Sequence, residues 1–152
     1  MGTIDLKKLK IRSLKEGDVG SVVKIDAEVL GQERTEFYQR KCKGATDSSD
    51  QLVTSLVAEY EGQIIGFVMG NLYLGEYGIP EKTASLDTIG VSPDYQKKGI
   101  GSELIKTYIE KLRKAGVEKI YGMIEWNDWS MFMLFEKCGF VPSRTINLEL
   151  KV

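Results

Sequence analysis

The stretch with the clearest chemical pattern is 95–104, which reads YQKKGIGSEL. Two glycines one residue apart, Gly99 and Gly101, precede a run whose apolar residues recur with helical spacing. The first turn of a helix presents unpaired N–H groups and the positive end of the helix dipole, and glycines let an anion approach the backbone closely. Lys97 and Lys98 add positive charge. These features suit a pyrophosphate, but GxG alone is equally typical of an ordinary loop that leads into a helix.

Two nucleotide-binding motifs fit this turn poorly. A dinucleotide-binding turn needs GxGxxG directly after a strand, but Leu104 occupies the third glycine position. The segment SPDYQKK also separates the glycines from the preceding predicted strand. The P-loop pattern GxxxxGK[ST] does not occur in the chain. A nucleotide-binding domain of either kind is therefore disfavoured.

The chain contains no histidine, the side chain that most often transfers protons near neutral pH. Its absence excludes Ser-His and Cys-His catalytic pairs and disfavours a zinc site. Asp87 lies in the apolar segment ASLDTIGV and, if buried, would have a raised pKa that suits a general base. The alternative is a carboxylate that pairs with a neighbouring cation or faces solvent. Glu125 follows the next predicted strand and is a second candidate base or substrate-binding residue, with a solvated carboxylate as its alternative.

The bulk composition favours one soluble domain over residues 1–152. The chain is 42% hydrophobic and 28% charged with a net charge of −1, so no global field attracts nucleic acid or an anionic membrane. No apolar run approaches the roughly 20 residues of a membrane span, and the N-terminus lacks the apolar region of a secretory signal. Cys42 and Cys138 have no metal or redox spacing, so we expect free thiols in a reducing cytoplasm. No metal, nucleic-acid or membrane partner is expected.

The hydrophobic periodicity predicts a mixed fold. The predicted helices are 16–30, 33–43, 101–115 and 128–138, and the predicted strands are 9–12, 52–60, 63–74, 84–91, 119–124 and 144–150. Residues 44–50 are interpreted as a polar loop, and Glu61-Gly62 as a hairpin turn. The crossover unit 84–124 predicts parallel strands with a right-handed connection, after an antiparallel meander. The expected class is α+β (mixed α/β), with helices on both faces of one mixed sheet.

With its flanks included, the glycine-rich turn resembles the GNAT acetyltransferase superfamily. Segment 96–101, QKKGIG, is similar to the [QR]-x-x-G-x-[GA] acyl-CoA motif of that family. Segment 135–140, FEKCGF, is similar to its YEKLGF ending. The motif-bearing resemblance covers about 84–142, and the order of predicted elements matches over the whole chain. The resemblance implies a sheet of about six to seven strands that splays between its fourth and fifth strands.

The resemblance implies that acetyl-CoA is the cosubstrate. Backbone amides of the turn would hold the pyrophosphate, and the strand before it would hold the pantetheine arm. Either Asn127 or Asp128 would contact the pantetheine, although Asp128 could equally be only a helix N-cap. The residues that the resemblance places at the coenzyme site are Ile89, Gly90, Val91, Gln96, Lys97, Lys98, Gly99, Ile100, Gly101, Ser102, Asn127, Asp128 and Phe135.

The implied reaction is direct attack of a small-molecule or peptide amine on the acetyl carbonyl, helped by positioning, deprotonation and an oxyanion donor. Many family members protonate the leaving thiolate with the tyrosine of YEKLGF, but Phe135 stands there and cannot donate a proton. Tyr108, Tyr121 or a water could substitute, or the thiolate could leave unassisted. A different acyl donor, an O-linked acceptor and a non-catalytic acyl-CoA-binding module stay open. The sequence also leaves a homodimer open.

The acceptor side is expected at the N-terminal helices and the loop after the third strand. Acids and tyrosines there would suit a cationic amine, with solvated acidic faces as the alternative. These residues are Asp26, Glu28, Glu33, Glu36, Tyr73, Glu76 and Tyr77. Trp126 and Trp129 are interpreted as core residues, with a pocket wall as the alternative.

Overall fold

The centre of this computed structural model, which describes residues 3–47 and 54–152, is a single mixed sheet. The strands are β1 (Lys10–Ser13), β2 (Ser55–Tyr60), β3 (Gln63–Leu74), β4 (Lys82–Val91) and β5 (Lys119–Gly122), in that spatial order. β1 to β4 pair antiparallel, whereas β5 pairs with β4 in parallel. The predicted antiparallel meander and parallel crossover are therefore confirmed.

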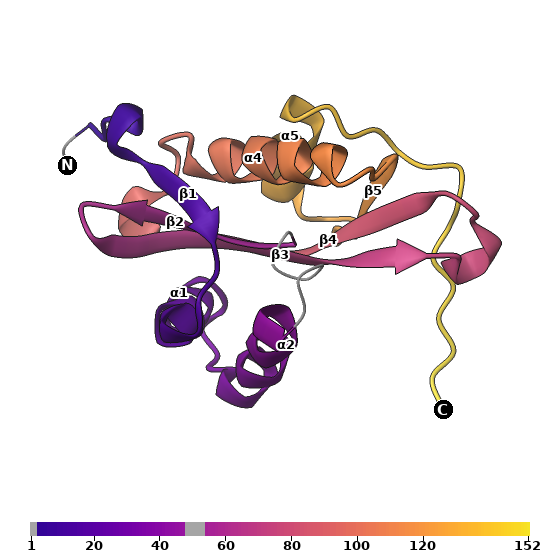
Figure 1. The fold of residues 1–152 in the computed structure, drawn as a ribbon, viewed down its shortest axis with the longest axis horizontal. Coiled ribbons are helices and arrows are strands. Elements are labelled where there is room, and N and C mark those ends of the chain that lie inside the picture. The colour runs from indigo at the N-terminus through magenta and orange to yellow at the C-terminus, as the bar shows by residue number, and fades with distance from the viewer. Residues whose placement is uncertain (1–2, 48–53) are drawn as a thin grey trace.

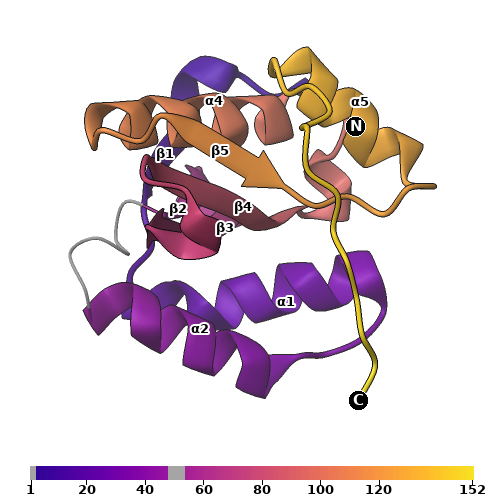
Figure 2. The ribbon, with the colours of Figure 1, turned by 90° about the vertical axis from the view of Figure 1, so that its right-hand side faces the viewer.

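Helices cover both faces of this sheet. They are α1 (Val19–Leu30), α2 (Thr35–Asp47), α4 (Ile100–Lys114) and α5 (Trp129–Lys137). α1 and α2 lie on one face, and α4 and α5 on the other (Figure 1). Figure 2 shows the same three layers from the side. Among residues 3–47 and 54–152, no helix has both the length and the apolar character that a bilayer crossing requires.

Local signals in the sequence explain most of the element ends. α1 ends at Gly31, which adopts φ 72°, and the β2–β3 hairpin turns through Glu61 and Gly62 at φ 49° and 82°. This pair of left-handed residues suits the twist of the flanking strands. α2 runs on to Asp47, four residues past its predicted end, because one internal glycine, Gly44, costs a helix only about 1 kcal/mol. The remainder of the predicted loop, 48–50, and the first residues of the predicted second strand, 52–53, lie outside the described residues.

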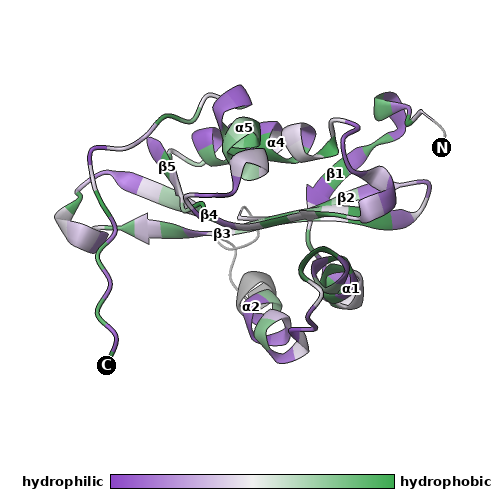
Figure 3. Ribbon diagram, turned by 180° about the vertical axis from the view of Figure 1, so that it is seen from behind, coloured by the Kyte–Doolittle hydropathy of each residue, from purple (hydrophilic) through white to green (hydrophobic). Residues whose placement is uncertain are grey.

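Each face of the sheet has its own hydrophobic core. Strand alternation separates them: Leu56 and Ala58 of β2 pack with α4, whereas Val57 between them packs with α1 and α2. The core under α4 includes Leu104, Ile105, Tyr108, Leu112 and Phe135. The core under α1 and α2 includes Leu14, Val22, Ile25, Tyr38, Cys42, Phe67 and Met69. Figure 3 shows hydrophobic and hydrophilic residues interleaved along these elements.

The C-terminal part of the fold differs from the sequence-based prediction. β5 ends at Gly122, two residues early, and residues 144–150 form no strand. This segment is extended and exposed, and the sheet therefore has five strands rather than six or seven in the part of the chain that is described. The alternating pattern of 144–150 is that of a strand, but a strand needs a neighbour to accept its hydrogen bonds, and this segment pairs with none of the five strands. It runs from the α4–α5 side of the sheet to the level of α1 and α2 (Figure 1).

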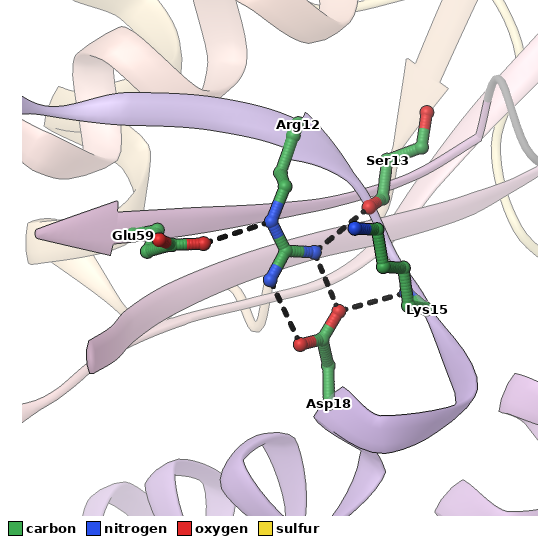
Figure 4. A network of polar contacts seen from close by, with 5 residues as sticks. All are labelled: Arg12, Ser13, Lys15, Asp18 and Glu59. Atoms are coloured by element: carbon green, nitrogen blue, oxygen red, sulfur yellow. Dashed lines mark hydrogen bonds and ion pairs between the residues drawn. The ribbon is translucent and has the colours of Figure 1, made fainter. Parts of the chain in front are cut away.

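A polar network ties β1 to β2 and to the start of α1 (Figure 4). Arg12 of β1 donates from Nε to Glu59 at 2.9 Å and from both terminal nitrogens to Asp18, at 2.7 and 3.0 Å. Asp18 also accepts a hydrogen bond from the Lys15 backbone N–H at 2.7 Å. These bonds outweigh the effect of burial, which alone would raise the pKa of Asp18, so that its pKa is lowered. The network fixes the sheet edge against the α1 layer.

Candidate active site

A slot opens where β4 and β5 part. Their parallel pairing covers only Thr83–Leu86 against Lys119–Gly122, and β4 continues to Val91 with no β5 beside it. The slot has a volume of about 220 Å³. Its lining residues are Asp26, Val29, Leu30, Arg34, Leu86, Asp87, Thr88, Ile89, Gly90, Met123, Asp128, Met131 and Phe135. The expected separation of the fourth and fifth strands is therefore present.

Phe135 of α5 forms the wall of the slot where β5 ends. A Cβ atom added to Gly122, the last residue of β5, would lie only 2.5 Å from Cε1 of Phe135. Phe135 is buried and also packs edge-on against Phe140, with ring centroids 4.7 Å apart. The glycine at 122 thus lets an aromatic ring lie directly against the strand end. The sequence placed Phe135 at the coenzyme site, and the structure places it in the slot as an apolar surface without a proton to donate.

The glycine-rich turn leads from the end of β4, through a short 3₁₀ turn at Pro93–Tyr95, to the N-terminus of α4. Lys97 and Gly99 both adopt left-handed backbone conformations, with φ 59° and 86°, and Gly99 is the N-cap of the helix. The first intrahelical hydrogen bond runs from the Glu103 N–H to the Gly99 carbonyl, at 3.1 Å. The N–H groups of Ile100, Gly101 and Ser102 precede it, so they belong to the helix start that lacks intrahelical acceptors. Their dipoles favour an anion at this point.

Two of the polar side chains predicted at the coenzyme site shape this turn. Gln96 donates from Nε2 to the Val91 carbonyl at 3.0 Å, which ties the turn to the end of β4. Lys98 donates from Nζ to the Asp94 carbonyl at 3.0 Å. Lys97, by contrast, is exposed. Its charge is thus placed at the helix start without a structural bond in the described residues.

At two further glycines of the predicted site, close packing leaves little room for a side chain. A Cβ atom at Gly101 would lie 3.3 Å from Cδ2 of Leu134, so the helix start packs closely on α5, next to the Phe135 wall. A Cβ atom at Gly90 would lie 2.7 Å from Cε1 of Phe67. Gly90 is therefore required by the core under α1, and its backbone still faces the slot.

Asp87 lies in the slot wall with two partners. Its Oδ2 accepts hydrogen bonds from Lys41 Nζ at 3.1 Å and from Asn71 Nδ2 at 2.6 Å. The residue is exposed rather than buried, so the burial on which the general-base hypothesis depended is absent. Both bonds use Oδ2, which leaves Oδ1 without a partner in the described residues. The structure agrees with the alternative interpretation, in which Asp87 pairs with a neighbouring cation, here Lys41.

A second polar cluster forms the opposite side of the slot. Arg34 donates to both carboxylate oxygens of Asp26, at 2.9 and 2.7 Å, and the Tyr38 hydroxyl donates to Asp26 at 2.8 Å. Burial, followed by the hydrogen bond to Asp26, raises the pKa of Tyr38. The Arg34 guanidinium lies over the ring of Phe37, 5.0 Å from its centroid. This cluster fixes the α1–α2 layer against the slot and places a cation at its edge.

The segment between β5 and α5 contributes less than expected. Asp128 caps α5 by accepting a hydrogen bond from the Met131 N–H at 3.0 Å, and it also lines the slot. Glu125 and Asn127 are exposed and do not line the slot. Trp126 and Trp129 were interpreted as core, which is wrong: 87% and 69% of their surface is exposed, because the segment projects from the body of the fold.

Neither tyrosine proposed as a substitute acid lines the slot. Tyr108 is fully buried, its hydroxyl donates to the Ser85 carbonyl, and burial raises the pKa of this phenol. Tyr121 lines a separate groove on the outer side of β5. Among the described residues, the slot therefore has no tyrosine placed to protonate a leaving group.

The sequence did not predict several residues that line the slot, and most of the residues expected on the acceptor side do not line it. Of the acids and tyrosines expected on the acceptor side, only Asp26 lines the slot. Arg34, Met123 and Met131 were not singled out. The signal for Arg34 was its spacing of four from Tyr38, which lets two polar groups meet on one helical face. No sequence pattern predicted that the two methionines line the slot, because their positions depend on how β5 and α5 pack together.

Comparison with known proteins agrees with this geometry. A family profile described as "Acetyltransferase (GNAT) family" matches residues 22–140. An acetyltransferase of Pectobacterium atrosepticum is 37% identical over 93 residues, which is 61% of each chain. The match thus spans about three fifths of the length of this curated relative.

Solved structures of low sequence identity share the fold. An aminoglycoside acetyltransferase from an uncultured soil metagenomic sample, in complex with sisomicin, superposes with a TM-score of 0.76 at 16% identity and covers 97% of this chain and 99% of its own. The aminoglycoside N-acetyltransferase AAC(6')-Iy, in complex with CoA, gives 0.77 at 14% identity and 94% coverage of both chains. The profile match, which spans most of the chain, shows that the protein belongs to the GNAT acetyltransferase family.

Proposed function

We propose that this protein transfers an acetyl group from acetyl-CoA directly to an amine of a small molecule or peptide. The observation that carries the proposal is that one strand, β4, both lines the slot and leads into the glycine-rich start of α4. β4 forms the slot wall over 86–90 and then leads, through the turn that Gln96 ties to Val91, into the helix start at Gly99. An anion held at the helix start would place an attached thioester arm along this strand.

The backbone of the glycine-rich turn is proposed to bind the pyrophosphate of coenzyme A. The N–H groups of Ile100, Gly101 and Ser102 are available at the positive end of α4. The free edge of Ile89–Val91 is proposed to hydrogen-bond the pantetheine arm, because β5 has already ended there. A CoA complex of a protein with the same fold supports this choice of donor.

The acceptor amine is proposed to enter the slot between Asp87 and the Asp26–Arg34 cluster. Lys41 and Asn71 hold Oδ2 of Asp87 and orient its carboxylate, so Oδ1 can accept a hydrogen bond from an incoming ammonium group. Asp87 would then position the amine for attack, and solvent water would take up the proton that the amine releases. The complex of a structural neighbour, an aminoglycoside acetyltransferase, with sisomicin supports the choice of an amine as acceptor.

A thiol-release assay with acetyl-CoA tests this proposal. We expect release with at least one amine in a panel of polyamines, aminoglycosides, amino acids and peptides with free N-termini or lysines. Calorimetry should show that Lys97→Glu weakens coenzyme A binding by about tenfold, the effect of roughly 1.4 kcal/mol at a helix start. Lys114→Glu is the matched control, because the same charge reversal at the far end of α4 should leave the affinity unchanged. Equal affinities for both variants would place the coenzyme elsewhere.

A non-catalytic acyl-CoA-binding module is the second candidate function. It is favoured by the slot itself, in which Phe135 supplies no proton and neither Tyr108 nor Tyr121 takes its place. The two functions differ in one pair of measurements. Coenzyme A binding with no thiol release across the panel would support the module, and thiol release that depends on an amine would exclude it.

A further inference from the structure

Two ion pairs lie at the slot, and each of them leaves one end unused. Asp87 pairs with Lys41, and Asp26 pairs with Arg34. Lys41 and Asn71 both bind Oδ2 of Asp87, so Oδ1 is an acceptor without a partner in the described residues. The other pair has an unused donor instead of an unused acceptor. The slot therefore has a place for a cation on one side and a place for an anion on the other.

The unused donor belongs to Arg34. Its Nε and Nη2 bind the two oxygens of Asp26, and Nη2 also donates to the Tyr38 hydroxyl at 3.3 Å. Nη1, which carries two N–H groups, has no hydrogen-bond partner in the part of the chain that the structure describes. The guanidinium is fixed by these bonds and by the ring of Phe37, and 32% of the side chain is exposed. Its open end can therefore bind a carboxylate.

Thr88 adds a third unsatisfied group to the slot. Its hydroxyl is buried and has no hydrogen-bond partner among the described residues, and the residue lines the slot next to Asp87. The Tyr38 hydroxyl lies near it but donates to Asp26. Because most buried polar atoms are hydrogen-bonded, we expect a polar group of a ligand to bind this hydroxyl.

The charges and the size of the slot limit the acceptor. Since Asp26 and Asp87 are each in an ion pair, Asp128 is the remaining ionised residue of the lining without one in the described residues. A polyamine with several ammonium groups would find too few carboxylates here, whereas a zwitterion brings its own anion. The slot volume of about 220 Å³ is also below the roughly 300 Å³ at which pockets for drug-sized ligands begin. Apolar side chains complete the lining, among them Leu30, Met123, Met131 and Phe135.

We propose that the acceptor is a small amino acid with an apolar side chain, whose ammonium group binds Asp87 and whose carboxylate binds Arg34 and Thr88. This inference rests on the proposed function and narrows its acceptor from any amine to a zwitterion. The nitrogen forms the new amide bond as the carbon–sulfur bond of the thioester breaks. Of the two protons that the ammonium group loses, one ends on the leaving thiolate and the other in solvent. The products are an N-acetyl amino acid and coenzyme A.

Thiol release with three matched acceptors tests this inference. They are L-leucine, L-leucinamide, which lacks the negative charge, and isopentylamine, which lacks the carboxyl group. We expect kcat/KM for leucine to exceed that for the other two by about tenfold or more, the effect of one hydrogen bond to a charged group. The amine of leucinamide is less basic than that of leucine, so a larger supply of unprotonated amine cannot explain a preference for leucine.

Two variants assign the preference to residues. The double variant Asp26→Asn with Arg34→Gln removes both charges of the ion pair, so no buried charge is left unpaired. Its ratio of kcat/KM for leucine to that for leucinamide should fall to about one, whereas general damage to the slot would affect both acceptors alike. Thr88→Val should lower this ratio by about threefold or more without loss of stability, because the hydroxyl that it removes has no partner. Arg40→Gln, at an exposed arginine of α2, is the control and should keep the full preference. A ratio that stays high in the double variant would overturn the role of Arg34.

Calorimetry on the complex with coenzyme A separates this inference from the proposed function. Leucine should bind about tenfold more tightly than leucinamide, and the folded double variant should bind the two equally. Equal binding to the wild type, or no binding of leucine, would overturn the inference and leave transfer to other amines standing. Binding of leucine that depends on its carboxylate, with no thiol release, would instead overturn the proposed function alone.

Discussion

At the scale of single residues, the slot depends on how side chains from distant positions meet. Asp87 is held by Lys41 of α2 and Asn71 of β3 on the same oxygen. Strand alternation could place Asp87 on a face of the sheet, but it could not identify these partners. The result is a carboxylate that is oriented by the fold and still has one oxygen open to a ligand.

Replacement of Asp87 should affect turnover more than coenzyme binding. In Asp87→Asn the carboxylate that orients the amine is lost, so we expect kcat to fall about 100-fold, as for a misplaced acceptor. Coenzyme A affinity should not change, because Asp87 lies away from the helix start at Gly99. Steady-state kinetics with calorimetry measures both quantities. Glu110→Gln, an exposed carboxylate of α4, is the control, and unaltered turnover in Asp87→Asn would remove this residue from the mechanism.

The two cysteines should react slowly in the folded protein. Both are free thiols, as expected from their spacing. Burial raises the pKa of Cys42 to about 11 and also raises the pKa of Cys138. The reactive thiolate is therefore scarce at pH 7 to 8. A colorimetric disulfide reagent should titrate the buried Cys42 only after denaturation and the partly buried Cys138 slowly in the native chain, and immediate reaction of both thiols would contradict this prediction.

At the scale of elements, β4 is the strand around which the site is assembled. It pairs with β3 along its length, with β5 over its first half only, and it leads into the glycine-rich turn. α4 is locked to it by the hydrogen bond from Tyr108 to the Ser85 carbonyl. That bond requires space at Gly70, where the β3–β4 register shifts. The alignment of α4 with the slot thus depends on one glycine in the neighbouring strand.

Gly70→Ala should be strongly destabilising. The added Cβ would lie 1.7 Å from the Ser85 carbonyl oxygen and 2.1 Å from the Tyr108 hydroxyl, so backbone or helix must move. We expect a loss of at least about 3 kcal/mol, the upper range for overpacked cores. Gly20→Ala is the matched control: nothing lies within 4 Å of its Cβ, and in α1 it should stabilise by up to about 1 kcal/mol. Denaturant unfolding measures both, and equal effects would contradict the close approach.

At the scale of the whole molecule, some features of the fold could be predicted from the sequence and others could not. The class, the order of elements and the β4–β5 crossover could be predicted because periodicity and glycine stops are local. The start of α4 could also be predicted, because the signal for it, the glycine-rich motif around Gly99, is local in the sequence. The Asp26–Arg34–Tyr38 cluster, the exposure of Trp126 and the missing last strand could not be predicted, because each depends on which surfaces the folded layers bring together or leave open.

The stability of the molecule in acid should depend on the network of Arg12, Asp18 and Glu59. Because the pKa of Asp18 is lowered in the folded state, its contribution is present above the unfolded pKa of about 4 and disappears as the pH falls through the folded value. Asp18→Asn should cost roughly 2–3 kcal/mol at pH 7, below the full cost for a buried pair because Arg12 is partly exposed.

Unfolding curves at several pH values measure this contribution. The difference in stability between the wild type and Asp18→Asn should be constant near neutral pH and should shrink below about pH 4. Glu28→Gln, which removes an exposed carboxylate on α1, should show no such trend. A difference that stayed constant down to pH 2 would mean that the network does not lower the pKa of Asp18.

The separate cores on the two faces of the sheet have a consequence for how such a protein can diverge. The layer of α4 and α5 holds the glycine-rich helix start, whereas the layer of α1 and α2 supplies Asp26 and Arg34 to the slot. Since the two cores do not interdigitate across the sheet, substitutions in one layer are accommodated without repacking the other. If the proposed function holds, a lineage can therefore change its acceptor through the α1–α2 layer and keep the helix start that would bind the donor.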